Sequence, residues 1–435
     1  MEFFDFQFLS ETFKDLKLIF SFLAPFKLVV LPIVVFIVFF IFKDAWLYYR
    51  QSLYKNNRIQ WDMVEVKIPR EIETGPKAME QFFTALWTLR NAAEGFKERF
   101  WDGEVTRWFS FEMVGDGGLV KFYIRMPKRL RHTIESMLYA QYPNIEIIDA
   151  VDYTDELPSS VDKIHELGFE IWGNEMVLGK SSAYPINTYQ LFEDKEGAER
   201  LIDPISMITE IMGKLKTDEK IWIQFLIRPA NPAWAKESQA LIEEYKKKAA
   251  PAAQAVQPGQ IPRQSFRGLA PNEEEELKLI GRKMSKPAYE TLIRYIYTAP
   301  RDTFNADLPK RGLAAYFGQY GSPTLNYFLS NFGVRTDVSW YRWPFFFAKK
   351  RLRERRKKIL FKYRTRFLPE ESFLGRVSES NILNIQLNKK SGLSIFNAEE
   401  LATLYHFPTN VVLTGSVTER IESKRVSPPR YIPYE

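Results

Sequence analysis

The sequence predicts an α+β protein that is held by one membrane-spanning helix near its N-terminus. An uncharged apolar run extends from Leu28 to Phe42. Beyond it, hydrophobic patterns follow the order strand, helix, strand, strand, helix, strand, and a similar order recurs later with an interruption. With 435 residues, of which 26% are charged, the chain is long enough for about two or three folded units beside the anchor.

The anchor is predicted over residues 24–49 as a transmembrane helix. With its flanking residues the apolar run reaches about 20 residues, which matches the hydrocarbon core of a bilayer. Trp46, Tyr48 and Tyr49 follow the run, where aromatic residues meet the membrane interface. A cleaved signal peptide is disfavoured, because the run starts late and lacks a small-residue cleavage site.

The charges around the span favour a cytoplasmic position for the folded part. Lys43, Arg50, Lys55 and Arg58 follow the span, whereas acidic residues dilute the lysines before it. We therefore expect a single-pass protein of the cell membrane whose soluble part is cytoplasmic. Residues 1–23 are expected to form an amphipathic, membrane-associated segment or, alternatively, a second and imperfect hydrophobic span.

The first folded unit is predicted over residues 60–155. Alternating apolar residues from Val64 to Ile68 predict a strand, and an amphipathic helix begins at Pro76. Two further strands meet at the hairpin sequence Gly115–Gly118, before a second helix and a final strand from Ile145. This βαββαβ order is that of a ferredoxin-like unit, so we expect an antiparallel sheet with both helices on one face.

A second unit of the same ferredoxin-like kind is predicted over residues 165–345. Its expected elements are a helix capped by Asp203, a strand at Ile221–Arg228, a helix at Trp234–Tyr245, a helix capped by Asn272, a strand at Tyr289–Thr298, helical segments at Leu313–Phe332 and a strand at Val334–Trp340. Residues 249–268, rich in Ala, Pro and Gln, are predicted to be a disordered insertion.

A basic helix is predicted over residues 346–367. Between Lys349 and Arg366, eleven Lys or Arg residues oppose the single Glu354, which leaves a net charge of −3 for the rest of a chain that carries +7 in total. Such a helix is suited to a polyanion, either the anionic leaflet of the membrane or DNA, and the alternative is an acidic protein partner. The candidate polyanion-binding residues are Lys349, Lys350, Arg351, Arg353, Arg355, Arg356, Lys357 and Lys358.

No catalytic, cofactor-binding or metal-binding residues are predicted. The chain has no cysteine, and its three histidines (His132, His165 and His406) form no metal-ligand pattern. The segment Gly173–Ser181 ends in Gly-Lys-Ser as phosphate-binding loops do, but five residues rather than four separate its glycines and Pro185 opposes the helix that must follow. We therefore expect a protein that is not an enzyme, and an enzyme built from dispersed residues is the disfavoured alternative.

The C-terminal part, residues 371–435, is predicted to contain a strand at Ile382–Leu387, a short helix and an extended tail. The helix begins with the capping-box sequence Asn397–Glu400 and is brief, since Pro408 follows soon after. A tail of this kind packs poorly by itself.

Four segments resemble a known family. Glu399–Pro408 and Ser427–Arg430 are similar to the segment just before the ATPase core in type IV secretion and conjugation ATPases, and Tyr184–Tyr189 and Ile68–Phe83 resemble the membrane-proximal region of bacterial conjugative DNA-transfer proteins. The resemblance covers roughly residues 60–435. In fused relatives a P-loop ATPase of the coupling-protein or HerA-like kind follows directly, and this chain stops before it.

The resemblance implies a non-catalytic membrane protein that docks a separately encoded P-loop translocation ATPase, with DNA or anionic lipid as a further partner and possible self-association left open. The residues expected to dock the ATPase are Glu400, Leu401, Leu404, Tyr405, His406, Phe407, Pro408, Pro428 and Pro429. The alternative is a membrane-anchored scaffold, unrelated to translocation, whose ferredoxin-like units bind other proteins.

Overall fold

The computed structural model describes residues 27–69, 74–91, 95–193, 203–249, 269–338, 347–369, 393–409 and 420–421. These residues fall into two compact units. The anchor unit comprises residues 27–58 and 95–105, and the sheet unit comprises the other described residues. The predicted segment 1–23, most of the insertion 249–268 and the predicted strand Ile382–Leu387 lie outside the described residues.

The anchor unit contains the helix α2, Lys27–Arg58, and a short π-helical segment, η2, Lys97–Asp102. Large apolar side chains from Leu31 to Phe42 are about half to two-thirds exposed. Within the described part of the chain, α2 is the one helix that is long and apolar enough to cross a membrane. The apolar run of the sequence therefore forms a single helix, which continues past the run to Arg58.

The sheet unit is built on one large sheet, mostly antiparallel. Its strands are β1 (Trp61–Pro69), β2 (Phe109–Asp116), β3 (Leu119–Pro127), β4 (Glu146–Asp149), β5 (Phe169–Leu178), β6 (Lys220–Pro229), β7 (Ala288–Pro300), β8 (Phe328–Ser330), β9 (Ser394–Asn397) and β10 (Arg420–Ile421). They lie in the order β10-β1-β3-β2-β6-β7-β5-β8, with β4 also paired to β1 and β9 to β7. The pair β1 and β10 is parallel, whereas the other described pairs are antiparallel.

The sheet consists of two halves with the same connectivity. Strands β1 to β4 lie in the order β4-β1-β3-β2, and strands β5 to β8 lie in the matching order β8-β5-β7-β6. The halves join edge to edge through β2 and β6, where Glu112 lies opposite Gln224. The two predicted units thus share one sheet, in which the edge strand of each half pairs with the other instead of facing water.

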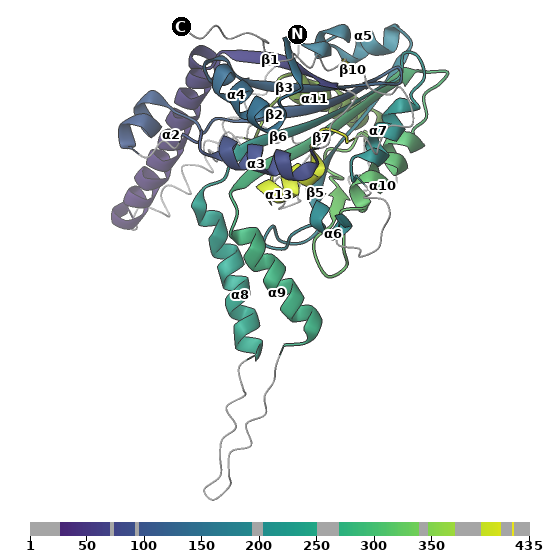
Figure 1. The fold of residues 1–435 in the computed structure, drawn as a ribbon. Coiled ribbons are helices and arrows are strands. Elements are labelled where there is room, and N and C mark those ends of the chain that lie inside the picture. Colours follow the sequence, from purple (N-terminus) through teal and green to yellow (C-terminus); the bar gives the residue numbers. More distant parts are fainter. Residues whose placement is uncertain are drawn as a thin grey trace, which may run out of the picture. The chain divides into compact units, whose positions relative to one another are not determined.

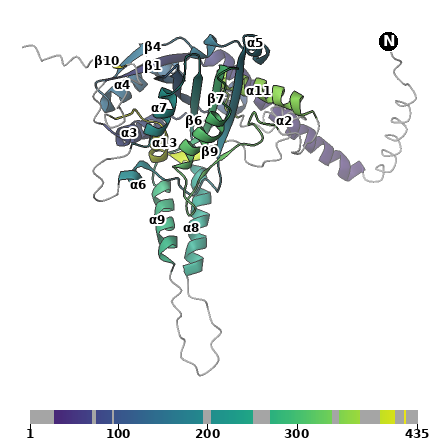
Figure 2. The ribbon, with the colours of Figure 1, turned by 90° about the vertical axis from the view of Figure 1, so that its right-hand side faces the viewer.

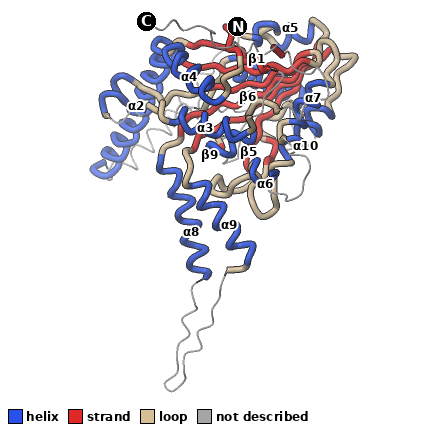
Figure 3. The backbone as a smooth tube through the Cα atoms, viewed as in Figure 1, coloured by secondary structure: helices blue, strands red, loops and turns tan. Residues whose placement is uncertain are grey.

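The helices of the sheet unit pack on both faces of this sheet, and Figure 3 shows the helices in blue and the strands in red. Their bounds are α3 (Pro76–Trp87), α4 (Arg131–Gln141), α5 (Val161–Glu166), α6 (Tyr189–Glu193), α7 (Ser206–Gly213), α8 (Ala235–Ala249), α9 (Pro271–Met284), α10 (Leu313–Gly318), α11 (Ala348–Arg364) and α13 (Ala398–Leu404), with short turns η3 (Lys128–Leu130), η4 (Tyr153–Glu156), η5 (Pro232–Trp234) and η6 (Leu308–Gly312).

Neighbouring residues of the longer strands serve two separate cores on opposite faces of the sheet. On β2, Phe109, Phe111 and Met113 belong to the larger core, which also holds apolar side chains of α3, α4, α7, α10 and α13. Val114 belongs to a smaller core on the opposite face, together with side chains of α5 and α11. Because both faces are covered, nearly every residue of β2 is buried.

Helices α8 and α9 form an antiparallel pair that projects from the sheet (Figures 1 and 2). They are inserted between β6 and β7, which are hydrogen-bonded neighbours. Their exposed surfaces are rich in Lys and Glu, and the phenol of Tyr245 on α8 donates a 2.6 Å hydrogen bond to Glu276 on α9. The two helices predicted on either side of residues 249–268 are therefore present, and they pack together as a pair.

Several local expectations differ from the structure. Strand β5 was not predicted, because burial on both faces removes the alternation that marks a strand. The last strand of the second half is β8, which lies inside the segment Leu313–Phe332 that was expected to be helical. The expected strand at Val334–Trp340 is not present in its described part, because residues 334–338 form turns and loop. Helix α9 begins with Pro271 after Ala270, so Asn272 lies in the first turn and is not the cap. Helix α7 begins with Ser206 after Ile205, so Asp203 is not its cap either.

Candidate functional site

Helix α11, the predicted basic helix, lies on the smaller core. Ile359, Leu360 and Tyr363 are fully buried, and the ring of Tyr363 lies 5.7 Å from that of Trp222 on β6. A Cβ on Gly173 of β5 would come within 2.8 Å of Ile359 Cδ1, so this glycine allows the helix to approach the sheet. Gly173 was part of the segment that resembles a phosphate loop, and in the structure it serves packing within a strand.

Most of the predicted polyanion-binding side chains contact other parts of this chain. Arg353 and Lys357 pair with Asp162 at 2.7 and 3.3 Å and lower the pKa of its carboxyl group to about 2. Arg356 pairs with Glu170 at 3.0 Å.

The other five residues of the predicted set differ in burial. Arg355 donates to the carbonyl oxygens of Phe332 and Arg335, and Arg351 is buried. Lys349 and Lys350 are exposed, whereas Lys358 is half-buried. The basic character of this helix is therefore partly neutralised within the fold, and its exposed positive charge lies mainly at its N-terminal end.

A buried ion cluster lies between the sheet and the C-terminal end of α11. Arg366, which has a left-handed φ of 48°, donates to both carboxylate oxygens of Glu112 at 3.0 Å and also pairs with Asp152. Tyr153 donates a 2.7 Å hydrogen bond to Glu112. Burial opposes ionisation of Glu112, but Arg366 and these hydrogen bonds hold its pKa below the usual value.

The sheet also caps the C-terminus of α11. Arg294 of β7 donates to the carbonyl oxygen of Lys362 at 2.9 Å, and Gln224 of β6 donates to that of Tyr363 at 3.1 Å. The last carbonyl groups of a helix lack partners within it and carry partial negative charge, so a buried guanidinium suits them. Arg294 is itself held by Glu175 of β5 at 2.8 Å. Together with the contact of Arg366 to Glu112 of β2, this network attaches α11 and the residues after it to both halves of the sheet.

The C-terminal segment, residues 393–409, is part of the larger core. Strand β9 adds to β7, and α13 packs against α3. The ring of Tyr405 lies 5.3 Å from that of Phe111, and the ring of Phe407 lies 5.0 Å from that of Tyr142.

This placement covers seven of the nine predicted docking residues: Glu400, Leu401, Leu404, Tyr405, His406, Phe407 and Pro408 are all buried. In this fold they are covered by their own chain and present no surface to a second protein. Pro428 and Pro429 lie outside the described residues.

Two acidic residues of α13 hold distant segments together. Glu400 accepts hydrogen bonds from the backbone amides of Ile186 and Asn397, each at 2.9 Å, and pairs with the buried Lys283 at 3.0 Å. Burial raises the pKa of Glu400 and lowers that of Lys283, so each charge depends on the other.

The neighbouring Glu399 completes this junction. It accepts a hydrogen bond from Thr188 and pairs with Lys286, each at 2.6 Å, and Lys286 also pairs with Glu80 of α3. Three of the four segments on which the sequence resemblance rests, around residues 68–83, 184–189 and 399–408, therefore meet at one place in the fold.

Asp203 and His406 form a second buried pair in this region. His406 Nε2 lies 2.6 Å from Asp203 Oδ1, and its Nδ1 lies 2.7 Å from the carbonyl oxygen of Ala402, so each ring nitrogen faces an acceptor. Thr409 donates to the other carboxylate oxygen of Asp203 through its amide and its hydroxyl. Burial opposes ionisation of Asp203, but His406 and these donors lower its pKa to about 2. The pair thus joins the C-terminal segment to the loop that precedes α7.

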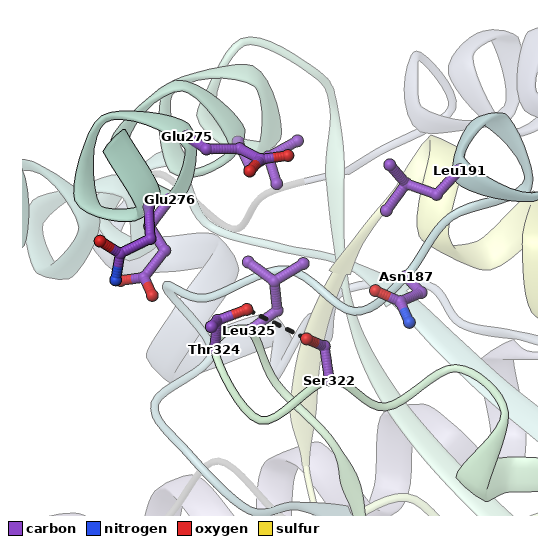
Figure 4. Close-up of a pocket in the computed structure, with 9 residues that line it drawn as sticks. Asn187, Leu191, Glu275, Glu276, Ser322, Thr324 and Leu325 are labelled. Carbon is purple, nitrogen blue, oxygen red and sulfur yellow. Dashed lines mark hydrogen bonds between the residues drawn. The ribbon is translucent and has the colours of Figure 1, made fainter. Parts of the chain in front are cut away.

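A small pocket lies between α9, α6 and neighbouring loops of the sheet unit (Figure 4). Its volume is about 170 Å³, and it is lined by Asn187, Leu191, Asn272, Glu275, Glu276, Leu279, Ser322, Thr324 and Leu325. Sites for small organic ligands usually measure about 300–1,000 Å³. None of the predicted site residues lines this pocket. Among the residues that the structure describes, no group of three or more His, Asp or Glu side chains is placed to hold a metal ion.

Comparison with protein families gives one match. Residues 48–357 match the family described as a domain of unknown function, DUF8128. The chain belongs to this family. No curated protein matches the chain. The DUF8128 match ends within α11, so the C-terminal segment that completes the larger core lies beyond the matched residues.

Proposed function

We propose that this DUF8128 protein is a non-catalytic, membrane-anchored component of a type IV secretion or conjugation-like machine that translocates DNA or protein, and that it docks a separately encoded P-loop ATPase. The observation that carries the anchoring is α2, whose apolar side chains from Leu31 to Phe42 are exposed. Exposed apolar side chains on every side of a helix are stable in lipid and unfavourable in water.

The sheet unit is proposed to lie in the cytoplasm, as the lysine and arginine residues after the span favour. The chain has no cysteine, so a single cysteine at the exposed Gln239 of α8 is a unique label site. A membrane-impermeant maleimide is expected to label it in inverted vesicles and not in intact cells. Labelling in intact cells would place the sheet unit outside.

The translocation role rests on the sequence resemblance, and the junction around α13 supports a particular version of it. We propose that Glu400–Pro408 serve as a rigid base, because they are held by the core, and that the docking residues follow Thr409 and include Pro428 and Pro429. A chain that leaves a fixed point can position an ATPase relative to the membrane. Each half of the sheet is further proposed to be a ferredoxin-like unit, which its strand order of fourth, first, third and second supports.

The polyanion-binding role is proposed for the exposed N-terminal end of α11, at Lys349 and Lys350. The remaining predicted residues of this helix have partners within the sheet unit or are less exposed. Anionic lipid, DNA and an acidic partner are all compatible with two exposed lysines beside the exposed ring of Phe347.

The test is recovery of the tagged protein from gently solubilised membranes, followed by mass spectrometry. The informative variant lacks residues 422–435, because this deletion leaves every described strand and helix in place. Deletion from residue 397 would remove β9 and α13 from the core and would confuse docking with unfolding. We expect a P-loop ATPase to accompany the full chain and to be lost with the shortened one. An ATPase-free preparation from the full chain would contradict the proposal.

A scaffold unrelated to translocation is the second candidate, and the projecting pair α8 and α9 favours it. Such a charged projection offers surface for a partner away from the sheet. Shortening the pair by removing residues 246–270 retains Tyr245 and Glu276, which are hydrogen-bonded to each other. Loss of co-purifying proteins from this variant, with no ATPase in either preparation, would support the scaffold.

A further inference from the structure

A short segment of the anchor unit, residues 95–102, exposes aromatic side chains beside α2. Phe96 is 80% exposed and Trp101 is 64% exposed. Aromatic residues and basic residues alternate closely here, since Lys97 and Arg99 lie between them and are also exposed. This combination is typical of segments at the interface between lipid and water.

The segment is attached to α2 just where the apolar run ends. The indole of Trp46 donates a 2.7 Å hydrogen bond to the carbonyl oxygen of Phe100, and its ring lies 6.5 Å from that of Trp101. Lys43, the first charged residue after the run, has its Nζ 5.4 Å from the centre of the Phe100 ring. A helix rises about 1.5 Å per residue, so Trp46 lies only about 6 Å beyond Phe42 along the axis.

The direction of the segment brings Phe96 toward the lipid side. Further along, Gly103 lies against Arg50, and the phenol of Tyr54 lies 3.5 Å from a carboxylate oxygen of Glu104. The segment therefore runs in the same direction as α2. The other end, at Phe96, is directed back toward the apolar run, and the centre of its ring lies 5.0 Å from that of Phe100.

Gly103 makes this close approach possible. Its φ is +70°, and a Cβ at this position would come within 2.4 Å of the Arg50 backbone. A left-handed conformation and contact with backbone are both conditions that favour glycine. A larger side chain at Gly103 should therefore push the segment away from α2, which provides a means of weakening the attachment.

We propose that residues 95–102 form a second contact with the bilayer, in which Phe96 and Trp101 enter the boundary between headgroups and acyl chains while Lys97 and Arg99 bind lipid phosphate groups. This inference rests on the proposed anchoring by α2. A helix alone can rotate and tilt in a bilayer, and an interfacial contact on one of its sides fixes its rotation and depth. The side chains of Glu98 and Asp102 are exposed and would face water beside the headgroups.

The experiment uses the full chain in vesicles of phosphatidylcholine and phosphatidylglycerol, with a single cysteine carrying an environment-sensitive dye. Phe96→Cys and Trp101→Cys report on the segment, Phe42→Cys on the span and Gln239→Cys on water. We expect the dye at positions 96 and 101 to shift to the blue and to be quenched by lipids labelled near the headgroup. The dye at position 42 should be quenched by lipids labelled deeper in the chain, and the dye at position 239 by neither.

The outcomes separate the two proposals. If position 42 is quenched and positions 96 and 101 behave like position 239, the segment does not contact lipid, while the anchoring stands. If position 42 is not quenched, the anchoring itself is wrong. A blue shift at position 96 without quenching by either lipid would mean that protein covers the segment and would overturn the inference.

A glycine substitution provides the matched control. Gly103→Val in the Phe96→Cys chain should detach the segment from α2 and return the dye to water. Gly281→Val in the same chain should leave the quenching unchanged, because a side chain there meets no atom within 4 Å. Equal quenching in both variants would show that attachment to α2 does not position the segment.

Discussion

Helix α11 and the C-terminal segment 393–409 are both predicted from the sequence to bind partners, and the fold uses them differently. Three fully buried side chains and a set of ion pairs hold α11 on the smaller core, and its N-terminal lysines remain exposed. The C-terminal segment is buried along its length in the larger core. A helix dominated by charge keeps an outer surface, whereas a short apolar helix becomes part of the interior.

The difference follows from the energies involved. Burying one Leu or Phe side chain stabilises a fold by about 1.5–3 kcal/mol, whereas an exposed ion pair contributes about 0–1 kcal/mol. The C-terminal segment buries Leu401, Leu404, Tyr405 and Phe407 within a few residues. Burial of these side chains in the core therefore stabilises the fold more than an exposed position would.

The largest expected effect is from truncation of the C-terminal segment. Replacing Leu404, Tyr405 and Phe407 together by alanine should unfold the sheet unit, because each change costs about 2–5 kcal/mol and a typical domain is stable by only about 5–15 kcal/mol. Thermal unfolding in detergent measures this. The matched control replaces Leu329, Tyr139 and Phe361, which are 41%, 41% and 63% exposed. If the core variant unfolded no more easily than this control, the packing described here would be wrong.

The next effect concerns the ion cluster below α11. Arg366→Met leaves Glu112 buried without its partner, so the free energy of unfolding should fall by about 3–5 kcal/mol. Arg353→Met removes an exposed pair with Asp162 and should lower the free energy of unfolding much less, because water screens this pair. Denaturant unfolding of the two variants gives the comparison. Adding Glu112→Gln to Arg366→Met should recover part of the loss, and a further loss would argue against a charge effect.

A smaller effect should depend on pH through Asp203. Its pKa is about 2 in the folded chain against an ordinary value of 3.8, so its ionised form stabilises the fold above about pH 4 and this stability is lost as the pH falls toward 2. The shift corresponds to about 2 kcal/mol. Asp203→Asn should therefore unfold more easily at pH 6 and show a weaker loss of stability between pH 4 and 2. Parallel curves for the two chains would mean that the pair with His406 contributes nothing.

The smallest effect on stability is expected at the exposed end of α11. Lys349→Ala with Lys350→Ala should change the free energy of unfolding by less than about 0.5 kcal/mol. If this end binds DNA, the slope of log affinity against log salt should fall by about 2 in the same variant. Fluorescence anisotropy with a short duplex, on protein in zwitterionic nanodiscs, measures this. Lys246→Ala with Lys247→Ala on α8 is the charge-matched control, and an equal slope for both variants would exclude a specific role for α11.

Local sequence was sufficient for the elements that carry their own signals. The apolar run, the strand–helix–hairpin–helix–strand order of the first half and the basic helix all depend on periodicity within a few residues, and each element is present in the structure. Strand β5 has no such signal, because Ile171, Trp172 and Met176 serve cores on opposite faces. Strand β8 has only three residues, which is too short for a pattern to show.

The sequence by itself determined the membrane-length helix, the α+β class and the local elements, because hydrophobic spacing, caps and turn residues act between near neighbours. Only the tertiary structure decided that the two halves share one sheet through β2 and β6, and that Leu404 and Phe407 face inward. It also decided which charges of the basic segment are neutralised, since Arg366 meets Glu112 across 254 positions of sequence. Such pairings depend on which surfaces the whole chain brings together, and no local pattern records them.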